Sequence, residues 1–97
     1  MADINFTWDP KKDKQNIKKH NVDFEEAKSV FYDDFARVIY DPDHSEDEDR
    51  FIILGTSKYQ NILIVCHCYR ENNSNIRIIS ARKANKNEKK HYMEFLL

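Results

Sequence analysis

Apolar and polar residues alternate along several short stretches of the chain, and this period of two is typical of β-strands with one buried face. Clusters of Asp, Asn, Ser and Pro separate the stretches, as expected for turns. The later strands follow one another through short turns, which favours an antiparallel meander. The predicted strands cover residues 5–8, 37–40, 50–56, 62–70 and 76–84.

Capping residues and helical spacing predict two helices after the first strand. The first covers residues 10–20, with Asp9 as its N-cap and Asn21 as the left-handed residue that ends it. The second begins at a capping box made by Asp23 and Glu26. Its apolar face is predicted to pack on the sheet through Phe24, Ala27, Val30 and Phe31.

A third helix is predicted near the end of the chain. Residues 85–88 form another possible capping box, and one stripe of the helix carries Tyr92, Phe95 and Leu96. The resulting order is β-α-α-β-β-β-β-α. We therefore expect one α+β domain over residues 1–97, with two N-terminal helices and one C-terminal helix packed on an antiparallel sheet.

Strand alternation also predicts which side chains share a sheet face. Cys66 and Cys68 are expected on one face and His67 on the other, so the three cannot converge on a metal ion and no metal site is expected. Arg77 and Arg82 are five residues apart. They are expected on opposite faces unless a bulge re-aims one of them.

The net charge of −1 hides a strong asymmetry along the 97 residues. Residues 33–50 contain eight acidic and two basic side chains, whereas residues 70–90 contain seven basic and two acidic ones. The basic region includes several arginines, whose fork of donors fits phosphate, so it suggests a surface for a polyanion. The alternative is a solvated sheet face decorated with arginine. No apolar run reaches membrane-spanning length and no signal peptide is evident, so a cytoplasmic location without membrane contact is expected.

The order of residues along almost the whole chain resembles the BrnT toxin family. The final run, Ile76-Arg77-Ile78-Ile79-Ser80-Ala81-Arg82, is the most specific part. One departure is Asn21, where the family usually shows Gly, although asparagine also tolerates the left-handed conformation. The other matching segments are Phe6-Thr7-Trp8-Asp9-Pro10-x-Lys12, Asn16-x-x-Lys19-His20-Asn21-Val22-x-Phe24-x-Glu26-Ala27, Asp41-x-x-His44, Glu48-x-Arg50, Val65-x-His67-x-x-Arg70, and Glu88 with Tyr92.

The resemblance implies a small, metal-independent ribonuclease toxin with a RelE-like fold, which needs no cofactor and inhibits translation. It further implies a cognate ribbon-helix-helix antitoxin of the BrnA type as partner. DNA would then be bound only through the toxin–antitoxin complex, and RNA would be the substrate.

Cleaving RNA without a metal requires the 2′-hydroxyl to attack the adjacent phosphorus, with groups that move protons and stabilise the phosphorane charge. Arg82 and Arg70 are the leading candidates for the charge, and Arg77 ranks below them. The acid and base are sought among His20, His44 and His67, with Lys19 as an electrostatic partner. Lys83 and Lys86 are candidates for holding the RNA backbone, and Trp8 and Tyr92 for stacking on bases.

Several of these residues also have structural interpretations. His67 within an apolar strand suits a hydrogen-bonded core residue, and Lys19 and His20 suit the negative end of a helix dipole. Trp8 and Tyr92 suit the core or its rim. For the whole chain, the competing hypothesis is a non-catalytic module that pairs with a DNA-binding regulator encoded next to it. A DNA-binding role of its own is weaker, because no helix-turn-helix pattern is evident.

Overall fold

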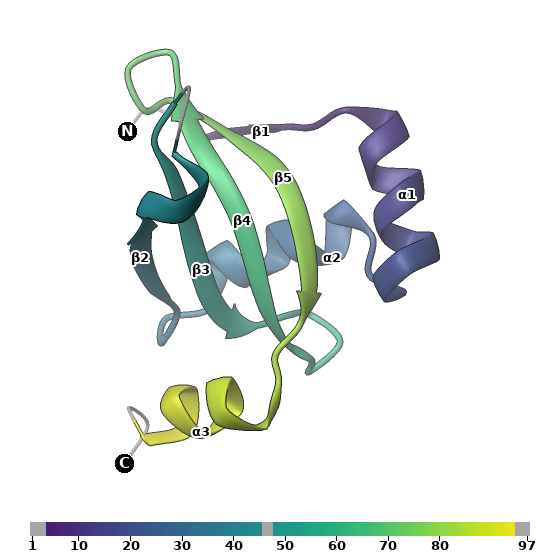
Figure 1. Ribbon diagram of the computed structural model, residues 1–97, viewed down its shortest axis with the longest axis vertical. Coiled ribbons are helices and arrows are strands. Elements are labelled where there is room, and N and C mark those ends of the chain that lie inside the picture. The colour runs from purple at the N-terminus through teal and green to yellow at the C-terminus, as the bar shows by residue number, and fades with distance from the viewer. Residues whose placement is uncertain (1–3, 46–47, 95–97) are drawn as a thin grey trace.

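The computed structural model describes residues 4–45 and 48–94, and in this part of the chain it contains one five-stranded sheet (Figure 1). The strands lie in the order β1-β5-β4-β3-β2. The consecutive strands β2 to β5 pair antiparallel, as expected, and β1 adds a short parallel pair to β5 at the edge. The bounds are β1 Asn5–Thr7, β2 Arg37–Asp41, β3 Arg50–Thr56, β4 Ile62–Arg70 and β5 Asn75–Lys83.

The helices occur in the predicted order, which confirms the α+β class. They are α1 Pro10–His20, α2 Phe24–Ser29 and α3 Lys86–Glu94, with short 3-10 helices η1 Val30–Tyr32 and η2 Pro42–His44. Figure 1 shows α2 behind the sheet, α1 beside β5, and α3 beyond the end of β5. The face of the sheet opposite α2 is therefore open.

The caps of α1 explain why it begins and ends where the sequence predicts. The Asp9 carboxylate accepts a hydrogen bond from the Lys11 N–H, and Pro10 occupies the first turn. Asn21 ends the helix in the left-handed region, with φ of 56°. Asparagine thus takes the conformation for which glycine is the usual residue.

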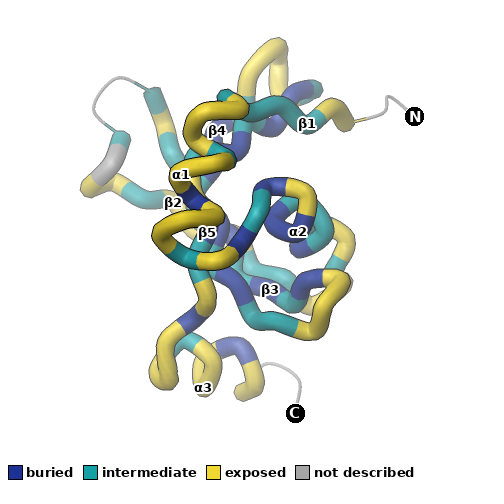
Figure 2. The backbone as a smooth tube through the Cα atoms, turned by 90° about the vertical axis from the view of Figure 1, so that its right-hand side faces the viewer, coloured by how far each residue is buried: buried dark blue, intermediate teal, exposed yellow. Residues whose placement is uncertain are grey.

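The core lies between α2 and the sheet. Phe24, Ala27 and Val30 pack from the helix side, and Ile53, Leu63, Val65, Ile78 and Ala81 pack from the sheet. Gly55, the chain's only glycine, faces them: a Cβ there would lie 2.9 Å from Ala36 and from Val30. Figure 2 shows that α1 and α3 are mostly exposed by comparison; Asn16 and Tyr92 are their buried residues.

The predicted capping box of α2 forms only in part. The Asp23 carboxylate accepts from the Glu26 N–H at 2.7 Å, as expected. The Glu26 carboxylate is directed elsewhere: it accepts from the Ser57 hydroxyl at 2.7 Å and the Asn61 amide at 2.8 Å. Glu26 is buried, and its burial is compensated by these bonds, which tie α2 to the turn between β3 and β4.

In the predicted stripe of α3, Tyr92 is buried, and its hydroxyl donates to Asp33 and accepts from Thr56. Phe95 and Leu96 lie outside the described residues. Among the described residues, no helix is long and apolar enough to span a membrane.

Candidate active site

A β-bulge in β5 places Arg77 and Arg82 on the same face of the sheet, which corrects the expectation of opposite faces. Along β4, Cys66 pairs with Ser80, but the next residue, His67, pairs with Ile78, so Ile79 is an extra residue. Arg77 then pairs with Cys68, on the same side of β4 as Cys66. The bulge changes the side-chain parity between the two arginines.

The same register confirms that Cys66 and Cys68 share a face while His67 points the opposite way. Both cysteines are free thiols. Burial raises the pKa of each thiol, so neither has the lowered pKa of a reactive cysteine.

The open face carries a cavity of about 230 Å³ where β3, β4 and β5 approach the end of α1. Its polar lining comes from distant parts of the chain. His20 ends α1, Asp41 and Arg50 pair across β2 and β3, and Ser80 and Arg82 follow the bulge in β5. A neighbouring hollow shares His20 and Ser80 with this cavity and adds Lys12 and Lys19 from α1. We refer to the first cavity as the Arg82 pocket.

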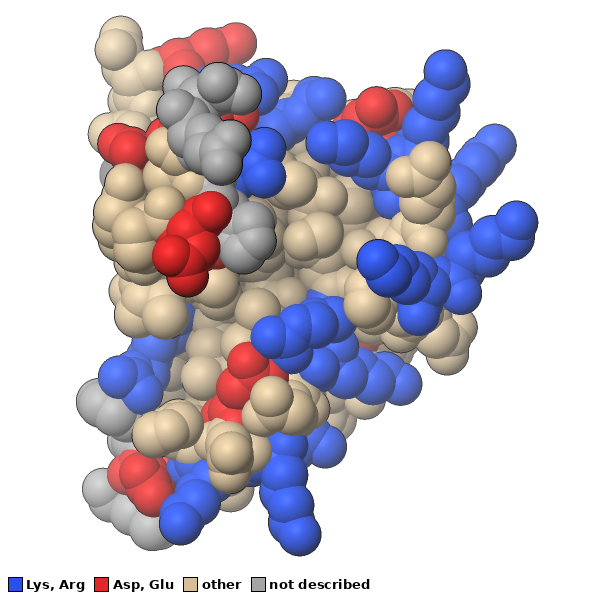
Figure 3. Space-filling view, in the orientation of Figure 1, with Lys and Arg blue, Asp and Glu red and all other residues tan. Residues whose placement is uncertain are grey.

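The charge of this face follows the asymmetry seen in the sequence. In Figure 3, Lys and Arg side chains gather over α1 and near the end of β5, around a hollow of uncharged residues. Asp and Glu side chains gather mostly on the β2 side. An anion that approaches the open face is therefore attracted toward the half that contains the Arg82 pocket.

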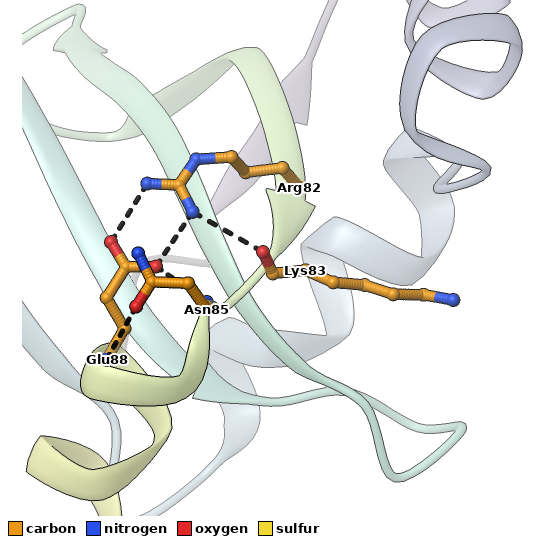
Figure 4. A network of polar contacts seen from close by, with 4 residues as sticks. All are labelled: Arg82, Lys83, Asn85 and Glu88. Carbon is orange, nitrogen blue, oxygen red and sulfur yellow. Dashed lines mark hydrogen bonds and ion pairs between the residues drawn. The ribbon is translucent and has the colours of Figure 1, made fainter.

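Arg82 is held by a two-pronged ion pair with Glu88 (Figure 4). Its Nη1 donates to one carboxylate oxygen at 2.8 Å and its Nη2 to the other at 2.9 Å. Nη1 also donates to the Lys83 carbonyl at 3.4 Å. A guanidinium has five N–H donors, so the edge formed by Nε and the second Nη2 hydrogen has no protein acceptor among the described residues. That edge matches two oxygens of a phosphate.

Glu88 has a second role as the capping box of α3. Its backbone N–H donates to the Asn85 side chain, and its carboxylate accepts from the Asn85 N–H at 2.8 Å, as the sequence predicts. The hydrogen bond from Arg82 is the main reason that the pKa of Glu88 lies below its usual range, and the same bond raises the pKa of Arg82. Both groups are therefore charged at neutral pH.

Arg70 lies far from the Arg82 pocket. It ends β4 and donates to Glu48 at 3.0 Å, with about half of its side chain exposed. Arg82 pairs with Ile64, six residues earlier on β4, which corresponds to about 20 Å along the strand. Arg77, opposite Cys68, is about 13 Å from Arg82 by the same measure. The three arginines share a face but cannot grip one phosphate together.

His67 is fully buried on the α2 side of the sheet, away from the Arg82 pocket. Its Nδ1 donates to the Val65 carbonyl and its Nε2 accepts from the Tyr69 hydroxyl, both at 3.2 Å, which suits a neutral ring. The ring also packs edge-on against Phe31, with centroids 4.8 Å apart. The structure thus favours the core interpretation of His67 over the catalytic one.

Burial of His67 predicts a loss of stability in mild acid. Burial lowers the pKa of the ring below its ordinary 6.5, although the Val65 carbonyl opposes the shift. The unfolded chain then binds the proton at a higher pH than the folded chain, so the free energy of unfolding falls as the pH drops below 6.5. Urea unfolding at about pH 7.5 and about pH 5.5 should show this fall in the wild type and a smaller fall in His67→Gln. Equal falls in the two proteins would contradict the assignment.

The remaining predicted site residues divide between the open face and the core. His20 and Lys19 lie beside the bulge, in the pocket and its neighbouring hollow. Lys86 is exposed at the start of α3, and Lys83 is exposed but points away from the Arg82 side chain (Figure 4). His44 lies in η2, and its side chain is outside the described part of the structure.

The two aromatic candidates for base stacking are packed inside the protein. Tyr92 is 3% exposed, so its ring offers no free face to a base. Trp8 is partly buried and packs edge-on against Phe24 with centroids 6.1 Å apart. This packing favours a core role for both residues over base stacking.

Sequence reasoning did not choose Asp41 and Arg50 as site residues, although both line the pocket. Their opposite charges stand at facing ends of two consecutive predicted strands, and β2 and β3 do pair them. That pairing was the signal available in the sequence.

Comparison with known proteins identifies the fold and the family of the chain. The crystal structure of the Brucella abortus ribonuclease toxin BrnT, at 1.1 Å resolution, has the same fold with a TM-score of 0.65. The match covers 86% of this chain and 99% of that chain at 24% identity. No curated protein matches the chain at a significant level. The family model for the ribonuclease toxin BrnT of type II toxin-antitoxin systems matches residues 8–88. The chain therefore belongs to the BrnT ribonuclease toxin family, as its sequence predicts.

Proposed function

We propose that the chain is a metal-independent endoribonuclease toxin that cuts RNA in the Arg82 pocket and thereby inhibits translation in the cytoplasm. The observation that carries the proposal is that Arg82 lines a pocket together with His20 and Arg50. Glu88 occupies one edge of its guanidinium and leaves the edge formed by Nε and Nη2 to bind a phosphate. Membership of a ribonuclease toxin family supports RNA as the substrate and an antitoxin as the partner.

The reaction we propose begins with attack of the 2′-hydroxyl oxygen on the adjacent phosphorus. His20 accepts the hydroxyl proton, because among the described residues it is the histidine that lines the pocket and an imidazole can act as a general base. The bond to the 5′-oxygen breaks, and that oxygen takes up a proton from His20 or from water. The products are a 2′,3′-cyclic phosphate and a free 5′-hydroxyl.

Arg82 and Arg50 stabilise the negative charge that develops on the phosphorane oxygens. The Glu88 carboxylate fixes the guanidinium of Arg82 before the substrate arrives, so little reorganisation is required at the moment of reaction. Lys12 and Lys19 in the neighbouring hollow can hold the phosphate of the next nucleotide, which extends the path of the RNA toward α1.

The test is incubation of the purified chain with a short RNA in excess EDTA. We expect cleavage, with products that carry a 2′,3′-cyclic phosphate by mass spectrometry. The matched control is an oligonucleotide of the same base sequence with deoxyribose throughout, which lacks the attacking hydroxyl and should stay intact. Failure of the wild-type chain to cut RNA, or cleavage of the deoxyribose control, would overturn the proposed mechanism.

For the partner, we propose a ribbon-helix-helix antitoxin that also carries DNA binding for the complex. Reading the neighbouring gene tests this directly. Co-purification of its product with the chain, together with loss of RNA cleavage, is the expected result. A tight complex formed by a chain that never cuts RNA would instead favour the non-catalytic binding module.

A further inference from the structure

The outer strand of the sheet, β2, presents apolar side chains and unpaired backbone to solvent. β2 is the last strand in the order β1-β5-β4-β3-β2, and among the described residues it pairs only with β3. Its three central residues, Val38, Ile39 and Tyr40, are each about half exposed: 47%, 58% and 50%. An edge of this kind is a template for another strand.

The sequence of β2 is complementary to itself when read in the reverse direction. From Arg37 to Asp41 it reads Arg-Val-Ile-Tyr-Asp. Antiparallel pairing of two copies about Ile39 places each Arg37 opposite an Asp41 and each Val38 opposite a Tyr40. Opposite charges and aromatic–β-branched pairs are both favourable across antiparallel strands. Arg37 and Asp41 also have contacts within their own protomer. The complementarity requires only that the two positions carry opposite charges, so it does not require those contacts to be lost.

We infer that the partner of this edge is a second copy of the chain, joined by antiparallel β2–β2 pairing about a two-fold axis at Ile39. Such an interface is isologous, so both copies use the same five residues, and the two sheets become one continuous sheet. Pro42 follows β2 directly and limits the pairing to this strand. A short pairing predicts reversible dimers whose population rises with protein concentration.

Charge exchange between positions 37 and 41 tests the pairing. In Arg37→Asp the two copies place Asp opposite Asp, and in Asp41→Arg they place Arg opposite Arg. Either change should weaken self-association on the order of tenfold, by sedimentation equilibrium or light scattering. Mixing the two single variants restores opposite charges at both pairs, so a heterodimer should form. The double variant, with both changes in one chain, should dimerise again. Failure of the mixture and of the double variant to associate would overturn the pairing.

A second pair of variants keeps the test independent of Asp41, which also lines the Arg82 pocket. Ile39→Asp places two carboxylates opposite each other on the axis and should abolish the dimer. Phe35→Asp is the matched control: Phe35 has the same exposed fraction, 58%, but lies outside β2, so its dimer should persist. Circular dichroism confirms folding of each variant. A wild-type chain that stays monomeric at every concentration would overturn the inference and leave the edge to a strand from a different protein.

Discussion

The Arg82→Ala variant should cut RNA about 10²–10³ times more slowly than the wild type, because it loses a preorganised donor to the transition-state charge, worth about 2.7–4 kcal/mol. The loss should appear mainly in kcat, since the donor interacts most strongly with the phosphorane. Arg82→Lys keeps the charge but not the two-donor edge and should remain strongly impaired. The measurement is single-turnover cleavage of a labelled RNA in EDTA.

Arg70→Ala is the informative comparison for that experiment. Arg70 has the same chemistry and lies on the same face, but the strand register places it about 20 Å from Arg82. We expect a much smaller loss, confined to RNA affinity. Equal losses from the two substitutions would show that the reacting phosphate does not lie in the Arg82 pocket. Thermal unfolding of each variant separates a loss of chemistry from a loss of folding.

Asn16→Ala should lower the free energy of unfolding by about 3 kcal/mol or more, because three buried backbone groups lose their partner. The Asn16 side-chain amide donates to the Val22 carbonyl at 2.8 Å and the Ala81 carbonyl at 2.7 Å. Its oxygen accepts from the Ala81 N–H at 3.0 Å. For a domain of this size the midpoint of thermal unfolding should fall on the order of 15 °C.

Gln15→Ala is the matched control for Asn16→Ala, since it truncates the exposed neighbouring amide on the same helix and should change the midpoint little. A similar midpoint for the two variants would contradict the role given to Asn16.

The bonds of Asn16 also join α1 to the residue before Arg82. In Asn16→Ala, RNA cleavage should therefore fall even at temperatures where the variant remains folded, as His20 is no longer held in place.

Local signals made most of the fold predictable from the sequence. Asp9, Pro10 and Asn21 mark the ends of α1 to the residue, and the strands β3 and β4 coincide with their predicted limits. These signals act between residues close in the sequence, as capping and alternation do. The parallel pairing of β1 with β5 joins residues about 70 positions apart in the sequence, such as Asn5 and Asn75, so it leaves no local signal.

The site was less predictable, because it depends on long-range partners. Glu26 has the spacing of a capping box, yet its carboxylate bonds to a turn some 30 residues away. His67 and Tyr92 belong to chemically suitable residue types, but burial removes them from the open face. Arg82 and His20 are the predicted residues that the fold does bring together, and Arg50 and Asp41 join them through strand pairing.

Because Ile79 is an extra residue, the in/out alternation of side chains along β5 changes phase at that point. Before it, even-numbered side chains such as Ile78 face the core, and after it the odd-numbered Ala81 does so. Removing Ile79 would make Ile78 and Ser80 neighbours opposite His67 and Cys66, so β5 would alternate regularly and Arg82 would keep its present face. The side of the sheet on which Arg82 lies is thus set by the bulge: a β5 that kept all its residues but paired regularly would turn either Arg77 or Arg82 away from the open face.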